Sequence, residues 1–475
     1  MEIDKDLAAR QEARTLCQQA ASAQKILSRM TQEQLDRICA AISQAFLLSA
    51  SQLAEAAVKE TGFGNTRDKT IKNKFASEDV WNAIRDTTAV GILRENPDEK
   101  LWEIGVPVGV IAAIVPSTNP TSTICYKTLI ALKAGNSIVF SPHPKAIQCS
   151  LLAAKIVADA AEKAGAPKGS IGCLSMASMA GCQELMTAQQ VRLILATGGP
   201  AMVRSAYSSG KPAIGVGAGN GPAYIHHSAD IDHALDCICR SKSFDNGTVC
   251  ASEQSIIVEK AIEEKVLHAA KRKGFYLMSE EEASALAALL FRPNGALNPD
   301  IVGKSAQTLA KMAGFAVSAD CKVLMAREQE AGPTRPYSME KLCPVLAFYV
   351  MEDENSVMNK AIEVLSHEGS GHTFSMHCND TTTIRRFAME IPVSRFLVNT
   401  PSALGGIGKS TNLFPALTLG CGAVGGSSSS NNISPLDLVN IRRVAWDNGS
   451  TAEENPADAS LIEIITAKIL EQLKK

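Results

Sequence analysis

The chain has 475 residues, of which 45% are hydrophobic and 20% charged, and its formal net charge is −2. This balance is typical of globular proteins, and without a basic excess nucleic acid is not expected as a partner. The apolar run 108–115 is far too short to span a bilayer, so no membrane association is expected. The charged N-terminus predicts that no signal peptide is present.

Thirteen cysteines are present, an odd number without any C-x-x-C pair. The pattern favours reduced thiols in a cytoplasmic protein over a disulfide framework or a zinc site. Most of these cysteines are expected to be small buried residues, so a catalytic role needs support from its local context.

Strands and helices alternate along the middle of the chain, which predicts parallel sheets with helices on both faces. A second α/β stretch is expected over about 250–425. The predicted elements are helices within 7–60, strands within 101–115 broken at Pro107, a strand at 137–140, a helix at 146–165, a strand at 191–196 and a helix at 231–243.

The C-terminal part ends in a short strand at 438–441, a polar linker and a helix that starts at Ser460 with a capping-box pattern. Its apolar residues fall on one face at helical spacing, and its charged residues avoid that face. The predicted apolar face consists of Leu461, Ile462, Ile465, Ile469 and Leu473.

Cys250 closes a short polar turn and precedes the apolar run 255–258, which predicts a strand. A cysteine nucleophile needs thiolate character, which nearby backbone dipoles or a base supply. On these residues alone, a nucleophile and a buried strand cysteine are both open interpretations.

The segment 244–254 reads Phe-Asp-Asn-Gly-x-x-Cys-Ala-Ser-Glu-Gln. It resembles the catalytic-cysteine motif of the aldehyde dehydrogenase superfamily, and in detail it is similar to that of the CoA-acylating aldehyde dehydrogenases. The resemblance covers about residues 8–446. It implies that Cys250 is the catalytic nucleophile.

A second motif, 115–122, ends a predicted strand in a polar loop with two prolines. In the superfamily an asparagine after this strand donates its amide to the developing oxyanion, together with the N–H of the cysteine. The resemblance implies this role for Asn119. Hydrolytic members usually read Pro-x-Asn-x-Pro, whereas Asn119 directly precedes Pro120, as in the acylating branch. A turn asparagine is the alternative.

The resemblance also implies a nicotinamide cofactor. The Gly-Gly turn after the strand at 191–196 opens a helix whose N–H groups can face a pyrophosphate. Hydrolytic members place a lysine shortly after the strand at 137–140, and its absence leaves NAD, the expected cofactor, and NADP both open. The implied cofactor-binding residues are Thr118, Ser141, Pro142, His143, Thr197, Gly198, Gly199, Gly217, Leu342 and Glu340, which corresponds to the glutamate that binds the nicotinamide ribose.

The stretch 205–228 contains no Asp or Glu. Hydrolytic aldehyde dehydrogenases carry here the glutamate that activates water for cleavage of the acyl-enzyme. Without this base water deacylates poorly, whereas a partly ionised thiol is already nucleophilic. The absence predicts coenzyme A as the acyl acceptor.

Three further motifs give weaker evidence of function. His372, in a segment similar to a Gly-His-Thr segment of the acylating enzymes, is a candidate for assisting thiol deprotonation, with a structural histidine as the alternative. The glycines of 215–219 lack the third glycine of a dinucleotide fingerprint, because Pro222 occupies that region. Gly408-Lys409-Ser410 lacks the first P-loop glycine, since Ala403 stands there.

The resemblance implies an α/β protein with the aldehyde dehydrogenase fold. The resemblance also implies a β arm that pairs with another subunit, which would give a homodimer or tetramer. The expected parts are a Rossmann-like NAD-binding domain over 1–225, a catalytic α/β domain over 226–420, a return segment and arm over 421–446, a linker over 447–459 and an amphipathic helix over 460–475.

The expected reaction oxidises a short-chain aldehyde, acetaldehyde or propionaldehyde, with NAD and coenzyme A to an acyl-CoA through a Cys250 thioester; no metal is expected. The alternatives are a hydrolytic enzyme whose base lies outside 205–228, an acylating enzyme for sulfoacetaldehyde whose anion meets the serines 427–430, and a scaffold with an idle site. The C-terminal helix resembles the encapsulation peptides of bacterial microcompartment enzymes, which bind shell or lumen proteins through an apolar face. A location inside a microcompartment in the cytoplasm is therefore expected.

Overall fold

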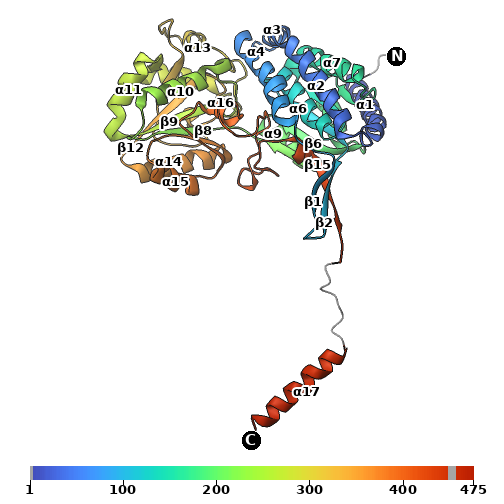
Figure 1. Ribbon diagram of the computed structural model, residues 1–475. Helices are drawn as coiled ribbons and strands as arrows, with labels where there is room; N and C mark the ends of the chain where they lie inside the picture. Colours follow the sequence, from blue (N-terminus) through green and yellow to red (C-terminus); the bar gives the residue numbers. More distant parts are fainter. Residues whose placement is uncertain (1–3, 448–455, 475) are drawn as a thin grey trace.

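The structure, a computed structural model, describes residues 4–447 and 456–474. Two α/β halves lie side by side, a narrow β arm extends from the N-terminal half, and a helix ends the chain (Figure 1). Most of the predicted linker, 448–455, lies outside the described residues. Each half is built on a parallel sheet, which confirms the predicted fold class.

The N-terminal half contains a five-stranded sheet. Its strands are β3 (Val110–Val115), β4 (Ile138–Pro142), β5 (Ile171–Cys173), β6 (Val191–Thr197) and β7 (Ala213–Val216). They are all parallel, in the order β5-β4-β3-β6-β7. The central strand β3 reads Val-Ile-Ala-Ala-Ile-Val and is buried along its whole length, as a strand covered on both faces must be.

Helices surround this sheet and confirm the predicted helical segments. They are α1 (Lys5–Leu27), α2 (Gln32–Leu48), α3 (Ala50–Thr61), α4 (Thr66–Lys74), a π-helical turn (Phe75–Asp79), α5 (Val80–Ile84), α6 (Pro120–Lys133), α7 (Ile147–Lys163), α8 (Met179–Thr187) and α9 (Pro200–Tyr207). Every residue of α6 is buried, because α2, α4, α7 and the sheet pack around it. The loop between β3 and α6 is therefore fixed at both ends.

The C-terminal half contains a seven-stranded parallel sheet. Its strands are β8 (Gly221–Ile225), β9 (Glu253–Glu259), β10 (Phe275–Leu277), β11 (Val323–Arg327), β12 (Val345–Met351), β13 (Gly371–His377) and β14 (Val393–Val398). Their order is β10-β11-β12-β9-β8-β13-β14. The helices are α10 (Ile231–Ser243), α11 (Glu263–Arg272), α12 (Glu280–Leu290), α13 (Ala306–Met312), α14 (Glu354–His367), α15 (Thr381–Glu390) and α16 (Ser402–Gly406).

The chain changes sheets between β7 and β8. The boundary expected at residue 225 placed β8 in the first domain, whereas β8 pairs with β9 and β13 of the second sheet. The physical reason is the short link 217–220, since a parallel neighbour in the same sheet needs a crossover of about a dozen residues or more. The expectation of two domains otherwise stays a proposal.

The β arm is a three-stranded antiparallel sheet formed by β1 (Gly91–Asn96), β2 (Leu101–Pro107) and β15 (Val439–Ala445), in that order. The strand expected at 438–441 is longer than predicted and pairs with β2 from Val439 opposite Pro107 to Ala445 opposite Leu101. Most of β15 is exposed.

The last helix, α17 (Pro456–Gln472), begins four residues earlier than predicted. Ser460 therefore lies inside the helix and is not its cap. Proline is favoured at the first helical position, where its missing N–H has no helical partner to lose, and this explains the earlier start. Every described side chain from Ser460 to Lys474 is exposed.

Among the described residues no single helix is both long and apolar enough to cross a membrane. One bent pair, α2 with α3, reaches the required length and composition, with an angle of 63° at the break.

Candidate active site

A cavity of about 220 Å³ lies where the carboxyl ends of β3, β6 and β7 face the turn that carries Cys250. Ligand sites of open α/β sheets form at this end of the strands. The cavity gathers most of the predicted site residues, namely Cys250, Asn119, Thr118, His143, Thr197, Gly198, Gly199, Gly217, Glu340 and Leu342. Three predicted residues, Ser141, Pro142 and His372, do not line it.

Cys250 follows the short 3-10 turn Phe244–Gly247 and stands just before β9. Of the thirteen cysteines, only Cys250 and Cys173 are not fully buried. Burial raises the pKa of the Cys250 thiol to about 12, and the Glu340 carboxylate adds to the rise. The Arg395 guanidinium and the N–H of Cys250 lower the same pKa. The thiol is therefore neutral at pH 7 in the free protein, and its ionisation depends on the charges around it.

Asn119 occupies the N-cap position of α6, but its side chain makes no capping hydrogen bond. The side-chain oxygen instead accepts a hydrogen bond from Lys72 Nζ. The side-chain nitrogen donates to Thr118 Oγ1 at 3.1 Å. The amide oxygen is thus occupied by Lys72, and one of the two N–H groups is still free to donate. Asn119 and Cys250 line the same cavity.

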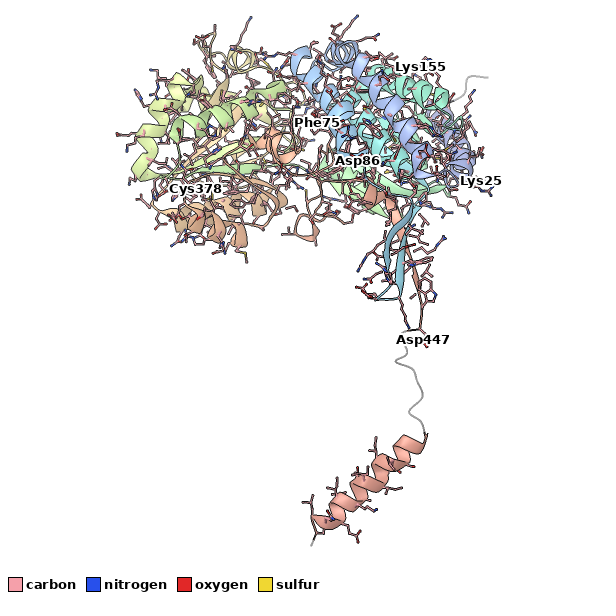
Figure 2. All side chains as sticks on the ribbon, in the orientation of Figure 1. Lys25, Phe75, Asp86, Lys155, Cys378 and Asp447 are labelled. Carbon is pink, nitrogen blue, oxygen red and sulfur yellow. The ribbon has the colours of Figure 1, made fainter. Side chains whose placement is uncertain are left out.

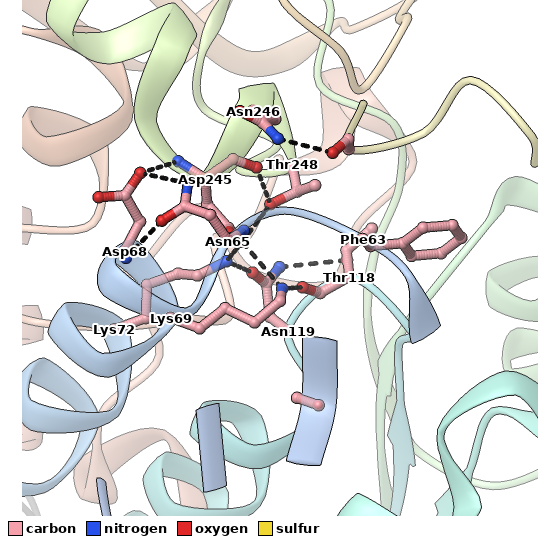
Figure 3. A network of polar contacts seen from close by, with 12 residues as sticks. Phe63, Asn65, Asp68, Lys69, Lys72, Thr118, Asn119, Asp245, Asn246 and Thr248 are labelled. Atoms are coloured by element: carbon pink, nitrogen blue, oxygen red, sulfur yellow. Dashed lines mark hydrogen bonds and ion pairs between the residues drawn. The ribbon is translucent and has the colours of Figure 1, made fainter. Parts of the chain in front are cut away.

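Lys72 belongs to a buried ionic network that the sequence reasoning missed (Figure 3). Lys72 and Lys69, one turn apart on α4, both bind Asp245 Oδ2, Lys69 at 2.9 Å. Thr248 Oγ1 donates to the same oxygen at 2.7 Å. Burial alone would raise the pKa of Asp245, but Lys72 and Lys69 hold it below its ordinary value. Burial lowers the pKa of Lys72 to about 8 against the opposing effect of Asp245.

No local signal in the sequence marks this network, because the burial of the α4 lysines is known only from the fold. The spacing of three residues puts Lys69 and Lys72 on one helix face, and in α4 the only buried residues are Lys69, Lys72 and Asn73. A helix that buries lysines must bring a carboxylate or other acceptors to them. The partner, Asp245, lies more than 170 positions along the chain, so no local pattern identifies it.

Glu340 brings the only carboxylate to the cavity lining, counted over the described residues. Its Oε1 accepts a hydrogen bond from the N–H of Gly219 at 2.9 Å, and its own N–H donates to Glu368 at 2.7 Å. Burial raises the pKa of Glu340 to about 8, and the Glu368 carboxylate adds to the rise. Gly219 belongs to the stretch 205–228, which contains no Asp or Glu, so this stretch contributes a backbone N–H that binds Glu340.

His372 lies on β13 behind the cavity. A Cβ placed on Gly219 would stand 2.0 Å from the Cys250 carbonyl oxygen and 3.1 Å from His372 Cε1, so the ring approaches Cys250 only across this glycine. Its Nδ1 bonds to Thr373 Oγ1 at 2.9 Å. Burial lowers the pKa of His372 to about 3, and the Arg395 guanidinium contributes. The imidazole is neutral and outside the cavity lining, so its assistance to a thiol remains only a prediction.

Ser141 and Pro142 end β4 and are both buried in the sheet. His143 follows them, lines the cavity and accepts a hydrogen bond from the N–H of Lys145 at 3.1 Å. Of the three residues predicted to bind the adenosine part of the cofactor, only His143 lines the cavity.

The serines 427–430, considered above as anion ligands, lie apart from this lining. Ser427 Oγ donates to the carbonyl of Gly215 at 2.8 Å, and Ser428 Oγ donates to that of Ala213 at 2.7 Å. These two hydroxyls tie the return segment to β7, so their hydrogens are not free to donate to an anion.

A model of the aldehyde dehydrogenase family matches residues 4–285, more than half of the chain. The chain belongs to the aldehyde dehydrogenase family. It is 44% identical over 424 residues to aldehyde-alcohol dehydrogenase 2 of Entamoeba histolytica, covering 87% of this chain and 49% of that protein. The chain spans about half the length of the first curated relatives that it matches. It is also 35% identical to the succinate-semialdehyde dehydrogenase (acetylating) of Clostridium kluyveri, covering 91% of this chain and 95% of that one.

Solved structures of the family match the fold closely. A probable aldehyde dehydrogenase from Listeria monocytogenes EGD-e is 53% identical with a TM-score of 0.93, covering 94% of this chain and 98% of that one. An acetylating aldehyde dehydrogenase from Geobacillus thermoglucosidasius is 48% identical with a TM-score of 0.92 and the same coverage. A propionaldehyde dehydrogenase from the fucose utilisation bacterial microcompartment of Clostridium phytofermentans is 27% identical with a TM-score of 0.84, covering 93% and 99%.

Proposed function

We propose that this aldehyde dehydrogenase is CoA-acylating and oxidises a short-chain aldehyde to an acyl-CoA through a thioester on Cys250. One observation carries the proposal: Cys250 and Asn119 share one cavity, to which the stretch 205–228 brings no carboxylate. Relatives and neighbours named as acetylating enzymes support the same reaction class.

The residues around the cavity fit a dinucleotide. The Thr197 hydroxyl is buried without a hydrogen-bond partner at the end of β6. A Cβ added to Gly199 or Gly217 would meet nothing within 4 Å, so open space lies next to the backbone at both positions. The first turn of α9 also opens here, where helix N–H groups favour a phosphate. Bound NAD would supply the hydride acceptor, and coenzyme A would supply the second thiol.

The first half of the reaction uses Cys250 and Asn119. The Cys250 thiol releases its proton to solvent, and the thiolate attacks the aldehyde carbonyl to form a hemithioacetal, whose oxyanion accepts hydrogen bonds from Asn119 Nδ2 and the Cys250 N–H. Such donors, aimed at charge that develops in the transition state, are worth about 3–4 kcal/mol each. Loss of hydride from the same carbon leaves the thioester on Cys250.

The second half transfers the acyl group from the sulfur of Cys250 to the sulfur of coenzyme A. The new thiol loses its proton as it attacks, and Cys250 leaves as a thiolate that can accept a proton. Water would need a general base in place of this ionised thiol. Among the described residues that line the cavity, Glu340 is the one carboxylate that could serve a hydrolytic enzyme, so the hydrolytic alternative rests on it.

The apolar side chains of the cavity favour a small uncharged substrate. Val249, Ile407, Leu417 and Leu419 line it together with Cys250. An aliphatic aldehyde such as acetaldehyde or propionaldehyde fits this lining, whereas the sulfonate of sulfoacetaldehyde would lose its hydration there and would meet Lys72, a cation already paired with Asp245. The named propionaldehyde dehydrogenase neighbour agrees with a short aliphatic chain.

The deciding experiment measures NADH formation at 340 nm from acetaldehyde and NAD with and without coenzyme A. Sustained turnover is expected only with coenzyme A. Cys250→Ala should abolish NADH formation, whereas Cys173→Ala, which removes the other incompletely buried cysteine, should keep it. Equal rates without coenzyme A would overturn the acylating assignment in favour of hydrolysis, and NADH formation by Cys250→Ala would overturn the role of Cys250.

The exposed residues of α17 support a location inside a bacterial microcompartment, with shell or lumen proteins as partners. An apolar helix surface that the rest of the chain does not cover suits binding to another protein. The microcompartment origin of the propionaldehyde dehydrogenase neighbour supports the same location. A homodimer or tetramer held by the β arm completes the proposal, because β15 offers an exposed strand edge.

A further inference from the structure

The Asn119 amide has two ends with opposite effects on an oxyanion. Its N–H donates to a negative oxygen and stabilises it, whereas its carbonyl oxygen repels it. A free amide can turn by 180° and exchange these ends, because nitrogen and oxygen have similar size. An oxyanion site built on Asn119 therefore needs a residue that fixes the orientation of the amide.

Lys72 contacts only one end of this amide. Its ammonium group has three hydrogens and can donate but never accept. The three acceptors within reach are Asn119 Oδ1, Asp245 Oδ2 and Thr248 Oγ1, the last at 3.3 Å. The atom of Asn119 that faces Lys72 must therefore be its oxygen, and this leaves Nδ2 on the opposite side.

Asp245 and α4 hold Lys72 in place. Lys72 is 2% exposed and Asp245 0% exposed, so water does not compete for their contact. The backbone N–H of Asn65 donates to Asp245 Oδ1 at 2.8 Å, and that of Asp245 donates to Asp68 at 2.7 Å. These bonds tie the start of α4 to the turn that carries Cys250 (Figure 3).

We propose that Lys72 is a positioning residue that fixes the Asn119 amide with its N–H toward the oxyanion. Asp245, in the turn before Cys250, is the anchor of Lys72. One polar network thus positions two parts of the site. It holds the turn that precedes Cys250, and it orients the Asn119 amide that donates to the oxyanion. The inference rests on the proposed function, since it concerns the hemithioacetal formed there.

Lys69 provides a matched control. It is buried on the same face of α4 and binds the same oxygen of Asp245 at 2.9 Å. Its other bond, at 2.8 Å, goes to the carbonyl of Thr118, and it makes no hydrogen bond to Asn119. Lys69→Met and Lys72→Met each remove one of the two cations from Asp245, so both should lower the melting temperature. Only Lys72→Met releases the amide.

The experiment measures kcat, KM for the aldehyde and the rate of the NADH burst without coenzyme A, which reports the hydride step. Lys72→Met should lower kcat and the burst rate by about 10- to 100-fold with KM changed little, which is less than loss of the donor itself because a released amide still adopts the productive orientation part of the time. Lys69→Met, which also loosens the shared anchor Asp245, should lower kcat markedly less than Lys72→Met does. If Lys72→Met does not give folded protein, Lys72→Gln takes its place with the same expectation.

A double-mutant cycle separates positioning from general loss of structure. Asn119→Ala should lower the burst rate by about 100-fold, and adding Lys72→Met should lower it less than about threefold further. Losses that multiply, or an unchanged burst rate in Lys72→Met, would overturn the inference and leave the proposed function standing. A parent enzyme that forms no NADH would contradict the proposed function itself and this inference with it.

Discussion

Buried ionisable groups surround the candidate active site, and each is held in one charge state by its neighbours. Burial keeps the Cys250 thiol neutral, and burial together with the Glu368 carboxylate keeps Glu340 protonated at pH 7. Because two negative charges in one cavity repel each other, a protonated Glu340 favours ionisation of the thiol. Glu340 therefore affects the cavity through its charge as well as through any bond to a cofactor.

This state of Glu340 predicts a pH dependence of stability. Burial raises the pKa of Glu340 from 4.5 to about 8, so the folded protein holds a proton that the unfolded chain releases above pH 4.5. The stability contributed by this proton is present below pH 4.5 and is lost as the pH rises to about 8. Glu340→Gln keeps a neutral side chain at every pH, so the variant should lose less stability than the parent over this range.

The measurement is the melting temperature of both proteins from pH 5 to pH 9. The difference between the two curves reports Glu340 together with its charge interactions with Lys242 and Lys341, whose pKa values the Glu340 carboxylate raises. The variant should gain on the parent as the pH rises toward 8. Parallel curves would mean that Glu340 is ionised in the fold and that its charge is compensated.

At the scale of elements, the turn before Cys250 depends on Gly247. Its φ is +76°, and a Cβ there would stand 2.8 Å from the backbone carbonyl carbon of Cys343. Backbone cannot move aside as a flexible side chain does. Gly247→Ala should therefore combine the cost of the left-handed conformation, about 1–2 kcal/mol, with a steric clash next to the nucleophile.

Gly210→Ala is the control for this prediction, because Gly210 has a φ of +78° and nothing within 4 Å of its Cβ position. Chemical denaturation should show a loss of about 1–2 kcal/mol for Gly210→Ala with activity retained. Gly247→Ala should lose more stability and most of its activity. Equal losses in the two variants would mean that the Cys343 backbone adjusts.

The sequence predicted the elements that depend on local pattern. Helix α10 was predicted with its observed ends, and the apolar runs at β3, β6 and β9 were predicted within a few residues. Cys250 and Asn119 were predicted from the resemblance of their motifs to the aldehyde dehydrogenase family, and both line one cavity. On its own residues Cys250 could equally have been a buried strand cysteine.

Pairings over long range could not be predicted in the same way. The contacts of Lys69 and Lys72 with Asp245 join segments that are distant in the chain. His372 has a suggestive motif, but its place behind Gly219 follows from how β8 and β13 pair. The order of the strands in the sheet and the position at which each strand ends decide which side chains reach the cavity. A local motif predicts neither of them.

At the scale of the whole molecule, α17 differs from every other helix. Each of the helices α1 to α16 buries at least one residue, whereas all described side chains of α17 from Ser460 onward are exposed. Figure 2 shows them as sticks on a helix apart from the rest. Ile464 and Leu470 are exposed as well, so the apolar surface is wider than the predicted face. Exposed apolar area of this kind is expected where a partner binds.

Removal of residues 460–475 should leave kcat and the melting temperature unchanged, because the described side chains from Ser460 to Lys474 are exposed and contribute little to folding. It should abolish capture by microcompartment shell proteins in a pull-down.

Replacement of Leu461, Ile465 and Ile469 by serine should have the same effect on capture, since binding through an apolar face depends on these side chains. Replacement of Glu463, Lys468 and Glu471 by serine is the matched control and should retain capture. Capture that survives the apolar replacements would show that another surface binds the shell, and a fall in kcat on truncation would show that α17 serves the enzyme itself.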